Sequence, residues 1–309
     1  MISSTSKLAR LARDGATPPV PQPRAPSLRG RLTQIAANRS AAVGGAVVLL
    51  YILAALIGPV IWPLDPYAQD LANRLVPPAW YPKGMMEHPL GTDSLGRDLL
   101  GRVLYGSRIS LAIGFGAASV GALVGVTLGA YAGYFGGRVD RVVTFVLTCR
   151  LALPSILLAM TMIYFISPSV TAVIVVIGLL HWTYFLMVCR SSTRRIRELD
   201  YVRAARISGA SAAQIIRWDV LPNLAGTISV VFTYEVAASI LAESALSFLG
   251  VGIPSPMPSW GLMIAEGKNL MLFNPWLVVI PGLALFGLVM AVNLLGDGLR
   301  DVFQPQLKG

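Results

Sequence analysis

Six long runs of apolar residues limit how this chain can fold more than any other feature. Each run holds about 20 residues or more, enough for a helix to cross a hydrocarbon layer about 30 Å thick. Inside a bilayer the backbone polar groups must bond within the segment, so such runs form helices. We therefore expect an all-α, polytopic membrane protein with six transmembrane helices, near residues 41–62, 109–134, 142–166, 168–189, 223–250 and 276–296.

The rest of the composition agrees with this class. Of the 309 residues, 55% are hydrophobic and only 13% are charged, whereas a soluble domain has about 25% charged residues. Cys149 and Cys189 lie in apolar runs without a CxxC pattern, and His88 and His181 have no partner at metal-ligand spacing. We therefore expect packing cysteines, no metal site and no cofactor.

The net charge of +10 is concentrated in segments on one side of the expected spans. Residues 1–40 carry seven Lys/Arg against one acid, and residues 190–222 carry another seven. Residues 63–108 carry five, balanced by five acids. Because Lys and Arg concentrate on the cytosolic side, both termini are expected in the cytosol. The charge also suits anionic membrane lipid, and we expect no nucleic-acid partner.

The chain divides into three expected parts. Residues 1–40, with their Pro-rich stretch, predict a disordered cytosolic tail. Residues 41–87 hold the first span and an external segment, and residues 88–309 form a core domain with five spans. The external segments 63–108 and 250–274 are either connectors or a mouth for a molecule arriving from outside, and their length favours the mouth.

The second span is rich in small residues. Gly114, Ala118, Ala122 and Gly125 predict a face that lets another helix approach closely. The alternative is the ordinary Gly and Ala content of membrane helices.

Residues 201–223, between two spans, read "YVRAARISGASAAQIIRWDVLPN". On one helical wheel a charged face separates from a small, apolar one. The charged face holds Arg203, Arg206, Ala210, Ala213 and Arg217, and the small face holds Ala205, Gly209, Ala212 and Ile216.

The "SGAS" stretch predicts two short helices in this segment, with Gly209 ending the first and Ser211 capping the second. A helix lying on lipid would show bulky apolar residues, so the small face favours docking of a protein partner. Close packing at this face predicts that Gly209→Leu abolishes docking or coupling. Leu221-Pro222-Asn223 predicts a sharp break before the fifth span.

The same segment resembles the cytosolic "EAA" coupling loop of ABC importer permeases, whose pattern is E-A-A, three residues, Gly, nine residues, I-x-L-P. Two positions depart from it, because Arg203 replaces Glu and Asp219 replaces Ile. The matching positions are Ala204, Ala205, Gly209, Leu221 and Pro222.

Three more stretches resemble the C-type permease subunit of the dipeptide/oligopeptide (and nickel) branch. They are "HPLGTDSLGRDLLGRVLYGSRISL" from His88, "ESALSFLGVGIPSPMPSWG" from Glu243 and "NLLGDGLRD" from Asn293. The resemblance implies a type I ABC importer permease fold in a bacterial cell membrane. It also implies a second permease subunit, partner ATPases and an extracytoplasmic binding protein, with di- or oligopeptides, or nickel, as cargo. From the pattern and the small face together we expect ATPase coupling at Arg203, Ala204, Ala205, Gly209, Ala212, Leu221 and Pro222.

No ATP site is expected in this chain. A Walker A motif needs G-x-x-x-x-G-K-[ST], and "GLMIAEGKN" has five residues between its glycines and Asn269 after the lysine. Energy must come from partner ATPases or from an ion gradient, and the chain itself is not expected to be an enzyme. A secondary transporter would show internal repeats, and an intramembrane enzyme a nucleophile–base pair or metal ligands; neither pattern is found.

Three ionisable residues fall inside expected spans: Arg150 in the third, and Glu235 and Glu243 in the fifth. Such residues are costly and usually functional. Either Arg150 faces the translocation pathway, with a peptide carboxylate as a transient partner, or it forms a structural ion pair with Glu235 or Glu243. Pro154, four residues after Arg150, predicts a kink beside it.

Overall fold

The computed structural model describes residues 28–303, and the regular elements in that range are helical. The chain from Ile35 onward forms one compact unit. Residues 1–27 of the expected tail lie outside the described range. The tail was expected to be disordered up to residue 40, but Leu28–Ala37 forms helix α2 and α3 begins at Arg39.

The long helices match the expected spans. Among residues 28–303, five helices are long and apolar enough to cross a membrane. A sixth span is formed if two shorter helices, joined at a bend of 89°, are counted together. The five are α3 (Arg39–Ile61), α4 (Leu99–Phe135), α7 (Val170–Ile196), the continuous helix Ala212–Phe248 and α12 (Trp276–Phe303); the bent pair is α5 (Gly137–Leu151) and α6 (Ser155–Ile166).

Helix α4 begins ten residues before the expected start of the second span, 99 instead of 109. The Asp98 side chain caps it by accepting a hydrogen bond from Gly101 N at 2.7 Å, which satisfies a free N–H of the first turn. Arg102 and Ser107 in the added turns are buried by protein. Hydropathy alone therefore places the start too late.

Pro154 has a stronger effect than a kink. Helix α5 ends at Leu151, and Pro154 is the residue before α6. A proline ring fixes its own φ and disfavours helix at the preceding residue. The third span is therefore two helices at a steep angle.

The break expected at Pro222 is wrong. The short helix α9 (Ala212–Ile215), the π-helical turn η2 (Ile216–Val220) and α10 (Leu221–Phe248) run on as one helix. Leu221 N bonds to Ile216 O, five residues back. Pro222 is the second residue of α10 and follows this π-helical turn directly.

A second proline, Pro59, marks the place where α3 is bonded to α4. Pro59 lies inside α3 and cannot donate to the carbonyl of Ala55. Arg108 of α4 donates to that oxygen instead, and to Leu56 O. The C-terminal end of α3 is thereby attached to α4.

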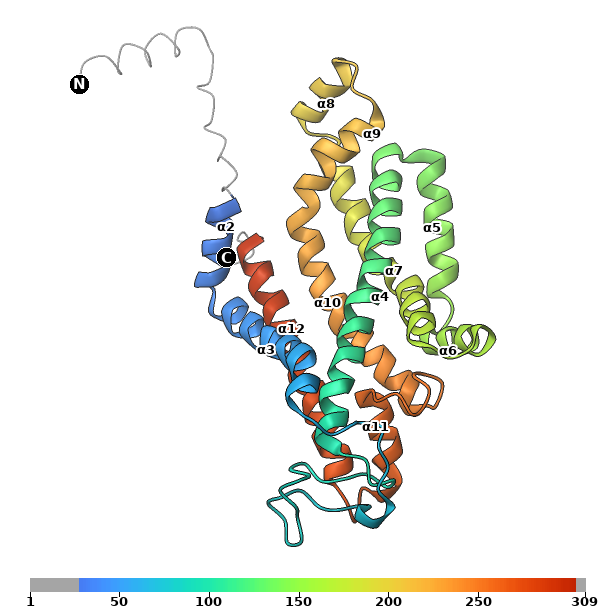
Figure 1. Ribbon diagram of the computed structural model, residues 1–309. Helices are drawn as coiled ribbons and strands as arrows, with labels where there is room; N and C mark the ends of the chain where they lie inside the picture. The colour runs from blue at the N-terminus through green and yellow to red at the C-terminus, as the bar shows by residue number, and fades with distance from the viewer. Residues whose placement is uncertain (1–27, 304–309) are drawn as a thin grey trace, which may run out of the picture. The chain divides into compact units, whose positions relative to one another are not determined.

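Helices α4 and α7 lie side by side (Figure 1) because glycines remove the side chains between them. A Cβ on Gly125 would lie 2.6 Å from Phe185 Cβ, and one on Gly129 would lie 2.8 Å from Leu186 O. Gly114 instead contacts Ile240 of α10. The prediction of close packing is confirmed, but the expected face serves two helices. The glycines of α4 that face α7 are Gly116, Gly121, Gly125, Gly129 and Gly133.

The remaining elements gather at the two ends of this unit (Figure 1). Helices α8 (Asp200–Ile207) and α9 lie at one end. At the other end lie the segment 62–98, which contains η1 (Leu71–Asn73), and α11 (Trp260–Gly267), which is followed by η3 (Lys268–Leu270). The expected boundary between residues 87 and 88 is bridged by hydrogen bonds, including Thr92 N to Val76 O at 3.0 Å and Ala79 N to Pro89 O at 3.1 Å.

Candidate functional site

The segment 200–220 forms the two short helices that the sequence predicts. Helix α8 ends at Ile207, and Gly209 follows with φ of +87°, a conformation that glycine adopts without strain. Ser211 then caps α9 in a capping box with Gln214: Gln214 N donates to Ser211 Oγ at 3.3 Å, and Ser211 N donates to Gln214 Oε1 at 2.8 Å. The turn between the helices is thus fixed by its own residues.

The inward side of this segment is aliphatic. Val202, Ile215, Ile216 and Val220 are buried against the ends of α4 and α7. Ala205 and Ala212 are partly buried in the same cluster. The single helical wheel was wrong because the helix is interrupted between residues 207 and 212. Ala205, Ala212 and Ile216 of the small face turn toward the chain itself, and Gly209 is exposed.

The outward side forms what we call the coupling surface, and it includes two bulky residues. Ile207 is 88% exposed and Trp218 is 68% exposed. The coupling surface consists of Ala204, Ile207, Gly209, Ala213 and Trp218, all exposed.

Arg203, the departure from the coupling-loop pattern, has a partner within the chain. Its Nη2 lies 3.1 Å from Glu198 Oε2, and Arg197 Nε lies 3.0 Å from the other oxygen. Hydrogen bonds from Arg203 and then Arg197 lower the pKa of Glu198 below its usual value. The positive charge at position 203 therefore belongs to a local pair at the start of α8.

Polar contacts connect α8 to the long helices. Asn223 Nδ2 donates to Tyr201 Oη at 3.2 Å, which joins α8 to the start of α10. The Arg206 guanidinium lies 5.4 Å from the centre of the Tyr134 ring of α4, a cation–π distance. Arg197 donates to Tyr134 O at 3.0 Å. A displacement of α8 would therefore reach α4 and α10 directly.

At the same end, Asp140 of α5 accepts hydrogen bonds from Arg190 and Arg194 of α7. Sequence reasoning assigned no role to these residues. The one signal was an acid in the otherwise basic loop "FGGRVDR", facing the arginines that follow the fourth span. The pair fixes the start of α5 to the end of α7.

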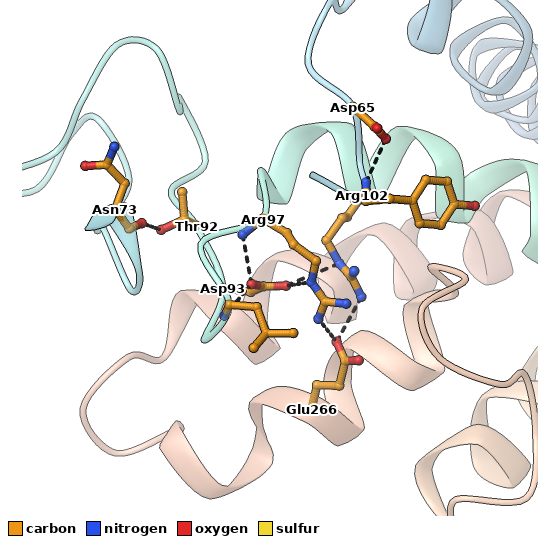
Figure 2. A network of polar contacts seen from close by, with 9 residues as sticks. Asp65, Asn73, Thr92, Asp93, Arg97, Arg102 and Glu266 are labelled. Atoms are coloured by element: carbon orange, nitrogen blue, oxygen red, sulfur yellow. Dashed lines mark hydrogen bonds and ion pairs between the residues drawn. The ribbon is translucent and has the colours of Figure 1, made fainter. Parts of the chain in front are cut away.

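At the opposite end, four charged side chains form a buried network (Figure 2). Arg97 Nε lies 2.6 Å from Asp93 Oδ2, and Glu266 Oε2 of α11 accepts from Arg97 at 2.9 Å and from Arg102 at 2.8 Å. Both arginine side chains are almost fully buried. The network attaches the segment 62–98 to α4 and α11, so this segment is a folded structure.

A second contact holds the same segment. The Asp98 carboxylate accepts from Trp62 Nε1 at 2.8 Å and lies 2.9 Å from His88 Nδ1. The sequence does not predict these two contacts, because Trp62 and His88 lie ten or more residues from Asp98 along the chain.

Within the spans, Arg150 contacts only neutral oxygens. Its Nη2 donates to Leu180 O at 2.7 Å and its Nη1 to Ser155 Oγ at 3.1 Å. Among the described residues, no ion pair joins Arg150 to Glu235 or Glu243, and Arg150 Nε has no hydrogen-bond partner. The direct ion pair considered from the sequence is therefore absent from this structure.

The two glutamates have other partners. Glu235 Oε2 lies 2.7 Å from His181 Nδ1 of α7, and Glu243 Oε1 accepts from Ser247 Oγ at 2.7 Å. Sequence reasoning missed the role of His181 because 54 residues separate it from Glu235. The only signal was that both residues are ionisable and lie in apolar runs.

A cavity of about 100 Å³ lies beside these groups. It is mostly apolar, with Ser155 and His181 as polar lining residues. Its wall comes from α6, α7 and α10: Ser155, Ile156, Ala159, Ile177, Leu180, His181, Ala242 and Leu246. Among residues 28–303, no group of three or more His, Cys, Asp or Glu side chains is arranged to hold a metal ion.

Comparison with known proteins identifies the family. Residues 125–309 match the family described as binding-protein-dependent transport system inner membrane component, and residues 31–78 match the N-terminal transmembrane domain of oligopeptide transport permease C. The chain is 35% identical to the dipeptide transport system permease protein DppC of Haemophilus influenzae, covering 88% of this chain and 92% of that one. It is 40% identical to the glutathione transport system permease protein GsiD of Pectobacterium atrosepticum, covering 72% and 73%.

A solved structure supports the fold. A chain from inward-facing conformations of the MetNI methionine ABC transporter aligns with a TM-score of 0.54 at 20% identity, covering 65% of this chain and 96% of that one. The helical architecture, the family match and the identity to the relatives agree. The chain therefore belongs to the family of binding-protein-dependent transport system inner membrane components, the multi-pass permeases of bacterial ABC importers.

Proposed function

We propose that this chain is the C-type permease subunit of an ATP-driven importer of di- or oligopeptides, and that it forms half of the translocation pathway. The cargo is supported by relatives named as dipeptide, di/tripeptide and glutathione permeases. Nickel is the second candidate, but the described residues include no metal-binding group. The importer family works with ATPase and substrate-binding partners; we further propose a second permease subunit, and that ATP hydrolysis takes place only in the partner ATPases.

The observation that carries this proposal is the construction of the segment 200–223. Its inward side is buried against α4, α7 and α10, while its coupling surface remains exposed. An ATPase that docks there and moves on binding ATP would carry α8 with it. Tyr201 and Arg206 would pass the motion to α10 and α4, switching the pathway between outward and inward access.

The coupling residues of the family pattern take different parts in this mechanism. Ala204 and Gly209 are exposed for contact, while Ala205 and Ala212 help hold α8 and α9 to the chain. Leu221 and Pro222 begin the helix that receives the motion. Arg203 positions α8 through Glu198.

The excess of Lys and Arg in residues 190–222 supports a cytosolic position for this segment and for both termini. The network of Asp93, Arg97, Arg102 and Glu266 would then face outward, where it holds a rigid surface for a binding protein.

Purification in mild detergent tests this function. The intact chain is expected to copurify with ATPase subunits and a second permease. Ile207→Asp, which places a charge on the coupling surface, is expected to lose the ATPase at least tenfold while the second permease remains. Leu272→Asp is the matched control, because Leu272 is equally exposed, at 88%, but lies after η3 at the opposite end. Absence of any ATPase and of any second permease from the intact complex would refute the proposal.

A further inference from the structure

The feature that carries a further inference is the environment of Arg150. It is the last basic residue of α5, and its side chain is partly buried. It donates hydrogen bonds to Ser155 and Leu180, two residues that line the cavity between α6, α7 and α10. Its hydrogen-bond acceptors, Leu180 O and Ser155 Oγ, carry no charge. A guanidinium in a membrane span normally contacts a carboxylate or lines an aqueous path.

The nearby acid is already occupied. Glu235 is near enough to Arg150 to interact through space, but its carboxylate is hydrogen-bonded to His181. Within the described part of the chain, Arg150 therefore has no anion in contact, and its Nε–H has no acceptor. The donor set of Arg150 is incomplete in this structure.

The surroundings of Arg150 suit an anion. Ser155, which Arg150 contacts, lines the cavity and is also the first residue of α6. Helix α6 starts without a side-chain cap, so its first N–H groups add partial positive charge beside the guanidinium. The cavity itself, at about 100 Å³, has room for a carboxylate and part of an apolar side chain.

We propose that this cavity binds the C-terminal carboxylate of a peptide during translocation, with Arg150 as the charged partner. The inference rests on the proposed import of peptides. The carboxylate would accept from Arg150 Nε and, in place of Leu180 O, from Nη2 on the same edge of the guanidinium, a two-point contact that guanidinium groups favour. The apolar wall from Ile156, Ile177 and Leu246 would contact the last side chain of the peptide.

Uptake of paired peptides into proteoliposomes that hold the whole importer tests this site. One peptide has a free C-terminus and the other is the same peptide as its C-terminal amide, each supplied with the binding protein. Both are measured with the unchanged complex and with Arg150→Gln. For each complex, uptake of the free acid is divided by uptake of the amide. The binding protein is the same in both complexes, so its preference between the two peptides cancels when these two ratios are compared.

Arg150→Gln is expected to lower uptake of the free acid about tenfold or more, which is the loss of a charge-assisted hydrogen bond. Uptake of the amide should change less than about twofold. An equal fall for both peptides would show a structural role, and no fall for either would show no role; either result overturns the inference.

Two controls complete the test. If Arg150→Gln does not assemble, Arg150→Lys replaces it, because Lys keeps the charge but loses the two-point fork. Arg150→Lys should reduce uptake of the free acid more than uptake of the amide. Equal reductions would again overturn the inference. If the unchanged complex imports neither peptide, the proposed function itself fails, so the two failures are distinguishable.

Discussion

Gly209 shows that one residue of the coupling pattern is required for its backbone conformation. Its φ is +87°, and a Cβ built on it would meet nothing within 4 Å. The sequence-based reason for its presence, close packing against a partner, has no counterpart in contacts within this chain. The positive φ gives a sufficient reason by itself.

Substitutions at Gly209 separate these two explanations. Gly209→Asn is expected to behave almost as the unchanged protein, because Asn tolerates a left-handed conformation. Gly209→Leu should destabilise the turn between α8 and α9 by about 1–2 kcal/mol. Hydrogen exchange of the α8 amides measures the turn, and copurified ATPase measures docking. If Gly209→Asn loses docking with unchanged exchange in α8, close contact with the partner is the reason for this glycine.

Arg203 is the second residue for which structure and pattern give different expectations. Restoring the acid of the family pattern with Arg203→Glu would place a carboxylate beside Glu198 and remove its main hydrogen-bond donor. The pKa of Glu198, now lowered, should rise. The start of α8 should exchange amide hydrogens faster at neutral pH.

The pH dependence of this contact follows from the same shift. Because the folded pKa of Glu198 is lowered, the contact is complete above the ordinary Glu value, about 4.3. It is lost as the pH falls through the lowered value. Titration of isotope-labelled Glu198 by NMR measures the pKa of this carboxyl group in the folded protein. A titration midpoint at the ordinary value in the unchanged protein would contradict the contact.

At the scale of elements, the glycines between α4 and α7 set how closely these helices pack. Gly125→Ala is expected to destabilise the protein by about 1–3 kcal/mol, because its methyl group overlaps Phe185 Cβ and the backbone of α7. Gly282→Ala in α12 is the matched control. Its Cβ meets nothing within 4 Å, so it should be neutral or stabilising by about 0.5–1 kcal/mol.

Thermal unfolding of the two variants and the unchanged protein in the same detergent measures this difference in stability. A lower midpoint for Gly125→Ala together with an unchanged or higher midpoint for Gly282→Ala is expected. Equal midpoints would mean that the two helices can separate enough to admit a methyl group, and the role of this stripe in close packing would be wrong.

The elements also show what the sequence can and cannot predict. The spans follow from hydropathy, since an apolar run of this length has few alternatives to a helix. The start of α4 was misplaced because its polar first turns are buried by α11 and the segment 62–98, whose contacts with α4 hydropathy does not register. The break at Pro222 was wrong because η2 accommodates the proline, and no local rule predicts a π-helical turn there.

The candidate sites divide in the same way. The coupling segment was predicted from local spacing, because its turn is built by its own residues, Gly209 and Ser211. The contacts of Arg150 with Leu180 and of His181 with Glu235 were not predicted, because the partners lie on other helices, 30 and 54 residues away in the chain. Only the folded chain shows that Glu235 is occupied and that Arg150 is left without an anion.

At the scale of the whole molecule, the sides of the membrane follow from three helix ends that meet. Asp140 joins the start of α5 to the end of α7, and Arg197 joins the end of α7 to the end of α4. These ends are therefore on one side, whether α5 and α6 cross the membrane fully or turn back within it. The segment 62–98 lies at the other end.

Labelling of single cysteines tests this arrangement. In a Cys149→Ser background, where Cys189 is buried, a membrane-impermeant maleimide is expected to label Met86→Cys in whole cells. Ile207→Cys should react only after the cells are opened, because the Lys and Arg excess favours a cytosolic position for α8. Both positions are more than 80% exposed in this chain, Ile207 at 88% and Met86 at 83%, so when the chain is expressed without its partner ATPases a missing reaction reports the side of the membrane. Reaction of Ile207→Cys in intact cells would reverse the proposed orientation and remove the coupling surface from the reach of an ATPase.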